Sequence, residues 1–294
     1  MNKLDRKTRA QILQMIAEGV SLRAISRMTG ISRNTGLKLV ADAGQAFGAY
    51  QDKVFHNLTC KRIQVDEIWS FVYAKALNAP IEKKIAGQAG DVWTWTAIDA
   101  DTKLIPSWYI GDRSGQSAWE FLTDLRSRLA NRIQLTSDGH KAYLIGVAGS
   151  FVDDVDFAQL VKIYGKEPHA GGMRRYSPPE CLGAIPTPVY GDPDPEHIST
   201  SFAERSNLSM RMGLRRFTRL TNAFSKKIEN HAYAVAIYFM HYNFVRIHQT
   251  LKISPAMAAG VTDKLWEMSD MVKVLEDWES SRNKRSTPFL PTAG

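Results

Sequence analysis

The sequence has 294 residues, of which 44% are hydrophobic and 10% aromatic. This length and composition suffice for one large domain with a packed core and one small domain, and they exclude a chain that is disordered throughout. The formal net charge is +8, and Lys and Arg are concentrated in residues 1–62 and 199–227. Positive charge gathered in this way favours a polyanionic partner.

The cysteines, Cys60 and Cys181, lie far apart and have no His at ligand spacing. Neither a disulfide framework nor a zinc site is indicated, and a reducing compartment such as the cytoplasm is expected. The first residues lack the apolar core of a signal peptide, and the apolar run 231–245 is interrupted by His and Asn. We therefore expect no membrane-spanning segment.

The N-terminal residues have the spacing of short helices. One helix is predicted over residues 4–18, and the run SLRAISRMTGISRNTGLKLVAD follows it. Ser21 and Ser32 are suitable N-caps for two further helices, with Gly30 in the turn between them. The last helix is predicted to end near Asp42. Two short helices joined by a glycine turn form a helix-turn-helix unit, whose second helix enters the major groove of DNA.

On this interpretation, three side chains of the second helix face DNA. Arg33 and Asn34 are expected near base edges, and Lys38 is expected nearer phosphate. Gly36 stands where such a helix normally carries an apolar residue, and it costs about 1 kcal/mol of helix stability relative to Ala. The alternative is a helical bundle with a solvated basic face; the compact, basic, N-terminal pattern favours the helix-turn-helix.

From Arg62 onward the apolar spacing changes to that of strands. RIQVDEIWSFVYAK and DVWTWTAIDADTKLIPSWYIGD predict three antiparallel strands, with a turn at residues 99–103. A helix capped by Ser114, the strand RIQLTSD, a short helix after Gly139 and the strand DFAQLVKIYG follow. This order predicts an α/β fold of the ribonuclease H-like class, in which helices flank a mixed sheet.

Composition sets the expected domain limits. Residues 165–198 contain seven of the twelve prolines and five glycines, which predicts a loop insertion. Arg174, Arg175 and Tyr176 within it are candidate DNA contacts. The predicted division is a helix-turn-helix domain (1–45), a linker (46–61), a ribonuclease H-like catalytic domain (62–250) with the insertion at about 165–198, and a C-terminal helical extension with a flexible tail (251–294).

Three acids stand where this fold would bring them together. Asp66 lies on the first strand, Asp138 ends the fourth, and Glu204 lies in the predicted helix around STSFAERSNLSMR. The first and fourth strands are neighbours in this fold, and the closing helix crosses beside them. Carboxylates that converge from separate elements are typical of a site that holds two magnesium ions against a phosphodiester.

The other acids have plainer explanations. Successive strand residues face opposite sides, so Asp66 and Glu67 are not expected to share a site. Asp66 is preferred because its face of the strand is more polar, and Glu67 is the alternative. The acids expected in a turn or in solvent are Asp99, Asp101, Asp153, Asp154 and Asp156.

The helix of Glu204 also carries basic residues. Arg211 lies two turns later on nearly the same face, where it can contact a DNA phosphate. Arg215, Arg216 and Arg219 are expected to extend a basic surface along the DNA path. The alternative is an ordinary amphipathic helix of mixed charge.

Taken in order, these motifs resemble the DDE-type insertion-sequence transposases, which share their fold with retroviral integrases. The likeness is strongest to the family of insertion sequence one. Two features depart from it: the chain lacks the cysteine-rich zinc module found in some relatives, and the insertion lengthens the interval before Glu204. The motifs are DEIWSFV (66–72), WTWTAIDADTKLI (93–105), TSDGHKAY (136–143), FAERSNLSMR (202–211) and YNFVRIHQTLKISPA (242–256).

The resemblance implies a metal-binding triad of Asp66, Asp138 and Glu204, with Arg211 as its basic companion. The implied cofactors are two Mg²⁺ or Mn²⁺ ions. The implied partners are the terminal inverted repeats of the element, target DNA and further copies of the chain, in the cytoplasm with the nucleoid. The tail segment, whose role the resemblance leaves open, contains Tyr242, Asn243, Arg246 and His248.

Two functions follow as hypotheses. The first is a transposase that cuts the ends of an insertion sequence and joins them to target DNA. The second is a helix-turn-helix DNA-binding regulator whose α/β domain senses a ligand or mediates assembly. Carboxylates gathered at the sheet would favour the enzyme, whereas a closed apolar pocket lined by tryptophans would favour the regulator.

Overall fold

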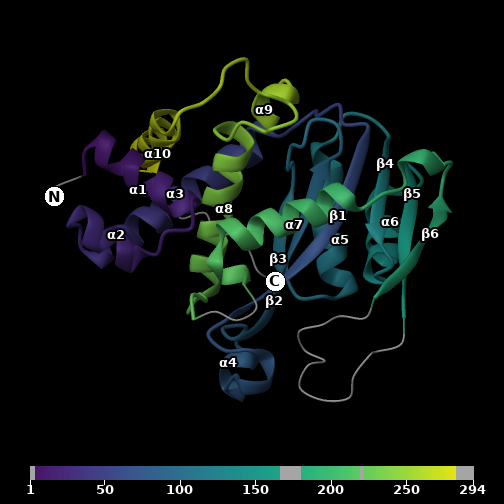
Figure 1. Cartoon of the computed structure of the whole chain (residues 1–294), viewed down its shortest axis with the longest axis horizontal. Helices are drawn as coiled ribbons and strands as arrows, with labels where there is room; N and C mark the ends of the chain where they lie inside the picture. The colour runs from purple at the N-terminus through teal and green to yellow at the C-terminus, as the bar shows by residue number, and fades with distance from the viewer. Residues whose placement is uncertain (1–3, 166–179, 219–221, 283–294) are drawn as a thin grey trace.

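The computed structural model describes residues 4–165, 180–218 and 222–282. Three helices come first along the chain. The strands that follow form one mixed sheet, and the later helices pack around it (Figure 1). The helices are α1 (Arg6–Ala17), α2 (Leu22–Thr29), α3 (Arg33–Val54), α4 (Ile81–Ile85), α5 (Gly115–Arg128), α6 (Ala142–Phe151), α7 (Ser201–Gly213), α8 (Ile228–Phe244), α9 (Pro255–Ala258) and α10 (Met268–Arg282). The strands are β1 (Arg62–Val72), β2 (Gly90–Asp99), β3 (Trp108–Gly111), β4 (Ile133–Asp138), β5 (Val155–Tyr164) and β6 (Cys181–Tyr190).

The N-terminal helices have the predicted caps. The side chains of Asp5, Ser21 and Ser32 each accept a hydrogen bond from a backbone N–H in the first turn of α1, α2 and α3. Gly30 ends α2 at φ 74°, a left-handed conformation that glycine adopts without a steric penalty. These contacts confirm the helix-turn-helix arrangement.

Helix α3 is longer than predicted. It continues past Asp42 to Val54 and packs against α8, with Phe47 fully buried. A Cβ added to Gly44 would lie 2.4 Å from the Cβ of Tyr233, so only glycine allows the two helices to approach this closely. The first half of the predicted linker is therefore a packed helix, because its apolar residues are buried against α8 rather than exposed.

The sheet confirms the ribonuclease H-like fold. Its strand order is β3-β2-β1-β4-β5-β6. The first three strands form an antiparallel meander, β4 lies parallel to β1, and β5 lies parallel to β4. The connections through α5 and α6 provide the crossovers that parallel pairing requires. This order places the middle of β1 beside the end of β4.

Helices cover both faces of the sheet (Figure 1). On one face, Ile68 of β1 packs in a cluster with Met210 of α7 and Phe239 of α8. On the other face, Trp95 of β2 packs edge-on against Tyr143 of α6, with ring centroids 5.2 Å apart. Helix α7 runs across the strands near the β1–β4 junction and so carries polar residues toward it.

Strand β6 lies inside the stretch that was predicted as a loop insertion. That prediction was wrong for this part because β6 is an edge strand, where the missing N–H of a proline leaves no ladder bond broken on the open side. Pro186 pairs within the ladder, and the register shifts next to Pro188, which absorbs the second proline. Residues 166–179, with Arg174, Arg175 and Tyr176, lie outside the described residues.

The remaining segments complete the helical part. Helix α10 packs against α1 and α3, and the tail 283–294 lies outside the described residues. Cys60 is buried, Cys181 is exposed, and both are free thiols. Among the described residues, no helix has the length and apolarity needed to cross a bilayer.

Candidate metal centre and nucleic-acid interface

Asp66, Glu67 and Asp138 form an acidic cluster where β1 and β4 separate. Each offers a carboxylate oxygen, and these oxygens all lie within 4.8 Å of one another. Strand β1 pairs with β4 only as far as Gln64, so the strands diverge just before Asp66. The carboxylates occupy the space that this divergence leaves. The strand order thus brings Asp66 and Asp138 together.

Asp66 sits in the most unfavourable electrostatic position of the cluster. Burial, together with repulsion from Glu67 and Asp138, raises the pKa of Asp66 to about 7. Its Oδ1 accepts a hydrogen bond from the backbone N–H of Glu67 at 2.8 Å, and its Oδ2 accepts one from Nδ2 of Asn207 at 2.8 Å. Both donors are neutral, so they orient the carboxylate without cancelling its charge.

Glu67 belongs to the cluster although strand alternation predicted that it would not. That prediction was wrong because the β1–β4 fork is open to both faces of β1 and because the Asp66 carboxylate turns along the strand toward the N–H of Glu67. Burial raises the pKa of Glu67. Arg113 lies 2.7 Å from its Oε1, and the Tyr143 hydroxyl donates to Oε2 at 2.9 Å.

Asp138 ends β4 as the chain turns toward α6. Its Oδ1 accepts a hydrogen bond from the backbone N–H of His140 at 2.9 Å, which fixes the carboxylate at the strand end. The backbone carbonyl of Asp138 accepts from Nε2 of Gln159 on β5 at 2.8 Å. The turn is therefore held on two sides, and the carboxylate stays at the fork.

Glu204 lies on α7 but its carboxylate is not part of the acidic cluster. Its Oε1 accepts hydrogen bonds from Nζ of Lys162 and from the Thr200 hydroxyl, each at 2.6 Å. Burial works against ionisation, but these two donors lower the pKa of Glu204. One turn further on, Asn207 reaches Asp66 instead. Asn207 was not singled out from the sequence, although its spacing of three residues from Glu204 places both on one helix face.

The acidic cluster suits a hard divalent cation such as Mg²⁺ or Mn²⁺, because all its ligands are carboxylate oxygens. The raised pKa of Asp66 indicates negative charge that its neighbours do not balance. In addition, Oδ1 of Asn207 is buried and has no hydrogen-bond partner among the described residues. A cation held by Asp66, Glu67 and Asp138 would balance this negative charge and would lie near Oδ1 of Asn207.

The candidate DNA-reading residues lie on the outside of α3. Arg33, Asn34 and Lys38 are all exposed. Gly36 of the same helix is buried, and a Cβ there would lie 3.1 Å from Cδ2 of Leu22. The small residue therefore lets α2 and α3 pack closely, which explains the departure from the usual apolar residue.

The basic residues after Glu204 differ in how far they are exposed to solvent. Arg211 is half-buried on α7, and Arg215 is exposed. Arg216 was expected on the surface, but its Nη1 donates inward to the Ser225 hydroxyl at 2.6 Å and to the Asn230 carbonyl at 2.9 Å. Burial lowers the pKa of Arg216 to about 10. Arg219 lies outside the described residues.

Tyr242 and Asn243 of the tail segment, which lie on α8, make structural contacts. Both amide atoms of the Asn243 side chain bond the backbone of Ile105, at 3.0 Å each. The Tyr242 hydroxyl donates to the carbonyl of Lys103 at 3.0 Å. These contacts pin the β2–β3 connection to α8. The backbone N–H of His248 bonds the carbonyl of Ile253 within the following turn.

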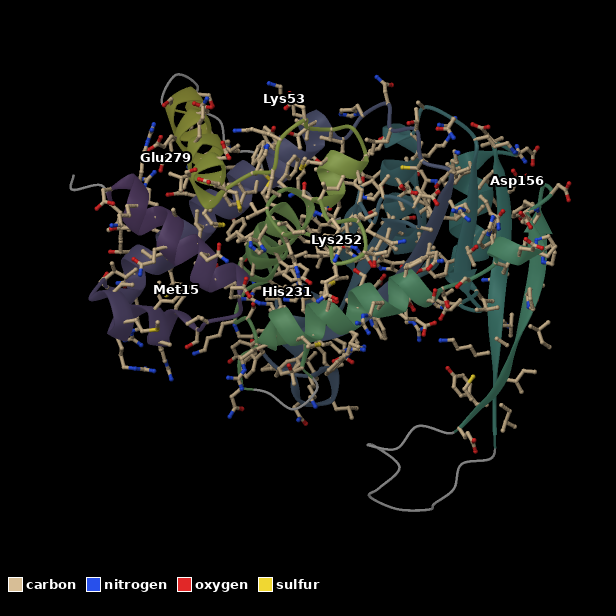
Figure 2. All side chains as sticks on the ribbon, turned by 45° about the horizontal axis from the view of Figure 1, so that its top comes forward. Met15, Lys53, Asp156, His231, Lys252 and Glu279 are labelled. Carbon is tan, nitrogen blue, oxygen red and sulfur yellow. The ribbon has the colours of Figure 1, made fainter. Side chains whose placement is uncertain are left out.

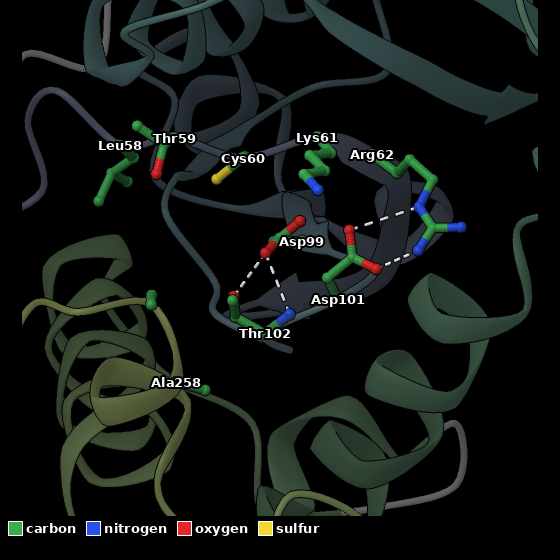
Figure 3. Close-up of a pocket in the computed structure, with 10 residues that line it drawn as sticks. Leu58, Thr59, Cys60, Lys61, Arg62, Asp99, Asp101, Thr102 and Ala258 are labelled. Carbon is green, nitrogen blue, oxygen red and sulfur yellow. Dashed lines mark hydrogen bonds and ion pairs between the residues drawn. The ribbon is translucent and has the colours of Figure 1, made fainter.

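A polar pocket of about 290 Å³ at the start of β1 contains other acids (Figure 3). Oδ2 of Asp99 accepts hydrogen bonds from the backbone N–H and the hydroxyl of Thr102, at 3.1 and 2.5 Å. Asp101 pairs with Arg62. These bonds explain both acids as turn residues. No residue of the acidic cluster lines this pocket.

The acids near the end of α6 are paired with arginines. Asp154 pairs with Arg126, and Asp156 lies 2.7 Å from Nη2 of Arg132. Asp156 lies on the far side of the molecule from Met15 and the N-terminal helices (Figure 2). These acids stabilise the strand end and do not contribute to the acidic cluster.

Comparison with known proteins gives one family match. Residues 3–43 match the model of a homeodomain-like domain, a range that covers α1, α2 and the start of α3. Among solved structures, a cryo-EM structure of a piggyBac transposase synaptic complex with hairpin DNA is similar, with a TM-score of 0.41 and 9% identity over 99% of this chain and 75% of that chain. No curated protein sequence matches the chain.

Proposed function

We propose that this chain is a DDE-type transposase, which cuts the ends of an insertion sequence and joins them to target DNA. The observation that carries the proposal is the acidic cluster at the β1–β4 fork of a ribonuclease H-like sheet. The homeodomain-like match at the N-terminus supports DNA as the partner. We also propose that the chain is related to the family of insertion sequence one, on the basis of the sequence motifs.

In this proposal, Asp66 and Asp138 hold two Mg²⁺ or Mn²⁺ ions, and Glu67 and Glu204 are the candidates for the third carboxylate. The ions would polarise the phosphodiester and lower the pKa of the attacking hydroxyl. Glu67 already lies in the cluster, whereas Glu204 would have to leave Lys162. The Lys162 ammonium would then be available to a DNA phosphate.

The chemistry consists of two displacements at phosphorus. In the first, a water oxygen bonds to phosphorus, the P–O3′ bond breaks, and the departing oxygen takes up a proton to become a 3′-hydroxyl. In the second, this hydroxyl loses its proton and bonds to a target phosphorus as a target P–O bond breaks. Arg211 and Arg215 orient the phosphates by charge. No side chain bonds covalently to DNA.

Recognition of the ends is assigned to α3. Arg33 and Asn34 would read base edges in the terminal inverted repeats, and Lys38 would hold a phosphate. Their exposure on one helix supports this role. Because two ends must be paired before joining, a homo-oligomer is expected on DNA.

The alternative, a ligand-sensing DNA-binding regulator, accounts for the N-terminal domain equally well. It does not account for three carboxylates within 4.8 Å of one another on neighbouring strands, which cost stability unless a cation is bound. The acidic cluster therefore favours the enzyme.

The direct test is nicking of DNA that carries the element's own termini, with Mg²⁺ present. We expect the wild-type chain to nick this DNA and Asp138→Asn to lose at least about 100-fold in rate, since the change keeps the shape but removes the charge. Asp101→Asn, which alters an acid outside the cluster, is the matched control and should retain the rate. Unchanged nicking by Asp138→Asn would remove the cluster from the reaction.

A further inference from the structure

The connection between β1 and β2 carries apolar side chains that the rest of the described chain leaves exposed. Leu77, Ile81 and Ile85 are 94%, 74% and 84% exposed. Ile81 and Ile85 are one helical turn apart on α4 and so share a face. We call residues 75–87 the β1–β2 knob. It projects from the lower edge of the molecule in Figure 1. Neighbouring exposed apolar side chains of this size mark an interaction site.

A groove of about 470 Å³ lies between α3, β3, α5 and α8. The apolar lining of the groove includes four half-buried side chains, those of Trp108, Ile110, Ile228 and Tyr233. Strand β3 is the last strand on this side of the described sheet, so its outer backbone groups pair with no described strand. An apolar edge strand in an open groove is a surface that proteins normally cover. We call it the α3–β3 groove.

The two surfaces are complementary in charge. The knob carries three lysines and one glutamate, for a net charge of +2. The groove lining carries four acids and one arginine, for a net charge of −3, which disfavours DNA and favours a basic apolar partner. The charged residues are Lys75, Glu82, Lys83 and Lys84 on the knob and Asp52, Glu120, Asp124, Arg128 and Glu229 in the groove.

The knob and the groove are also neighbours in the fold. The backbone N–H of Tyr73, just before the knob, donates to the carbonyl of Ser225 at 2.8 Å. Ser225 is followed closely by Ile228, which lines the groove. Adjacent complementary surfaces on one chain can pair reciprocally about a twofold axis, so that each copy gives a knob and receives one.

We propose that the β1–β2 knob inserts into the α3–β3 groove of a second copy of this chain and thereby forms a twofold dimer. The apolar stripe of Leu77, Ile81 and Ile85 covers the β3 edge, and Lys84 faces Glu229 at the rim. The dimer places two acidic clusters in one assembly, as joining two DNA ends requires. The inference rests on the proposed function only for its expectation of an oligomer.

The test is sedimentation velocity on the full chain without DNA or metal. We expect a dimer for the wild type and a dissociation constant at least about tenfold higher for the double variant Ile81→Glu/Ile85→Glu. Both positions are mostly exposed, so the change leaves the fold intact. Leu182→Glu on β6, at a side chain that is 65% exposed, is the matched control and should leave the dimer unchanged.

The groove side is tested independently. A Cβ at Gly48 meets no atom within 4 Å, and Gly48 lines the groove, so Gly48→Leu adds a larger side chain at the groove wall. It should weaken the dimer as the knob variant does. Lys84→Glu should also weaken it, and Glu229→Lys in the same chain should restore it.

A wild-type chain that stays monomeric up to about 100 µM, where specific interfaces are normally populated, would overturn the proposal. A dimer that survives both the knob and the groove variants would overturn it equally. Because the assay uses neither metal nor DNA, a failed cleavage experiment leaves it unaffected. Failure of the dimer likewise leaves the metal chemistry standing.

Discussion

At the scale of single residues, the ionised form of Asp66 is destabilised by its burial and by its acidic neighbours. Its pKa of about 7 exceeds the ordinary 3.8 because burial and two neighbouring carboxylates oppose its ionisation. The folded chain therefore keeps a proton on Asp66 at pH values where the unfolded chain has released it. The metal-free protein is expected to lose stability as the pH rises from about 4 to 7, and a bound cation would offset that loss.

This expectation can be measured by urea unfolding of the metal-free protein at pH 5 and pH 7.5. The unfolding midpoint of the wild type should be lower at pH 7.5, and Mg²⁺ should raise it more at pH 7.5 than at pH 5. Asp66→Asn removes the titrating group, so its midpoint should depend less on pH. An equal dependence in both proteins would show that Asp66 does not hold the unbalanced charge.

The sequence predicted part of this site for a physical reason. Asp66 and Asp138 were placed together because strand order determines which strand ends meet. Glu67 was expected only as the alternative to Asp66 and not beside it, because alternation describes regular strands, and β1 leaves β4 just before this point. The rotamer of Glu204, turned to Lys162, depends on a contact between residues 42 positions apart, which local patterns do not contain.

At the scale of elements, α3 joins the two parts of the molecule. It begins with the exposed residues Arg33 and Asn34 and ends packed against α8 of the larger part. A rigid helix of 22 residues thus replaces a linker. The orientation of the DNA-reading surface relative to the sheet is set by the α3–α8 crossing at Gly44 and Tyr233.

The crossing is tested with two glycines one turn apart. Gly44→Ala should destabilise the chain by about 1–3 kcal/mol, because its Cβ would lie 2.5 Å from the backbone Cα of Tyr233 and the helices would have to separate. Gly48→Ala meets open space and should be neutral or stabilising by up to about 1 kcal/mol. Thermal unfolding of both variants measures the difference. Equal effects would mean that the crossing is not tight.

Element prediction succeeded where local chemistry decides the structure. Ser21, Ser32 and Ser114 cap helices as predicted, and the meander turn lies at Asp99 as expected. It failed for β6, because proline content argues against a strand unless the strand is known to be an edge. It also failed for the length of α3, because burial against α8 is a tertiary effect.

At the scale of the whole molecule, surfaces of different charge suit different partners. Exposed basic residues of α3, together with Arg215 just after α7, suit DNA, while the α3–β3 groove is acidic and suits the basic knob of a second copy. The carboxylates of the acidic cluster, where β1 and β4 separate, suit a metal ion. This layout accounts for the basic net charge and for the acidic minority together.

The most direct measurement is anomalous diffraction from crystals of the full chain grown with Mn²⁺. The account predicts a peak about 2 Å from carboxylate oxygens of Asp66 and Asp138, and its contacts will identify Glu67 or Glu204 as the third ligand. Crystals of the Asp138→Asn variant grown in the same way should show no such peak. Mn²⁺ bound elsewhere, with no peak between Asp66 and Asp138 in the wild type, would contradict the account.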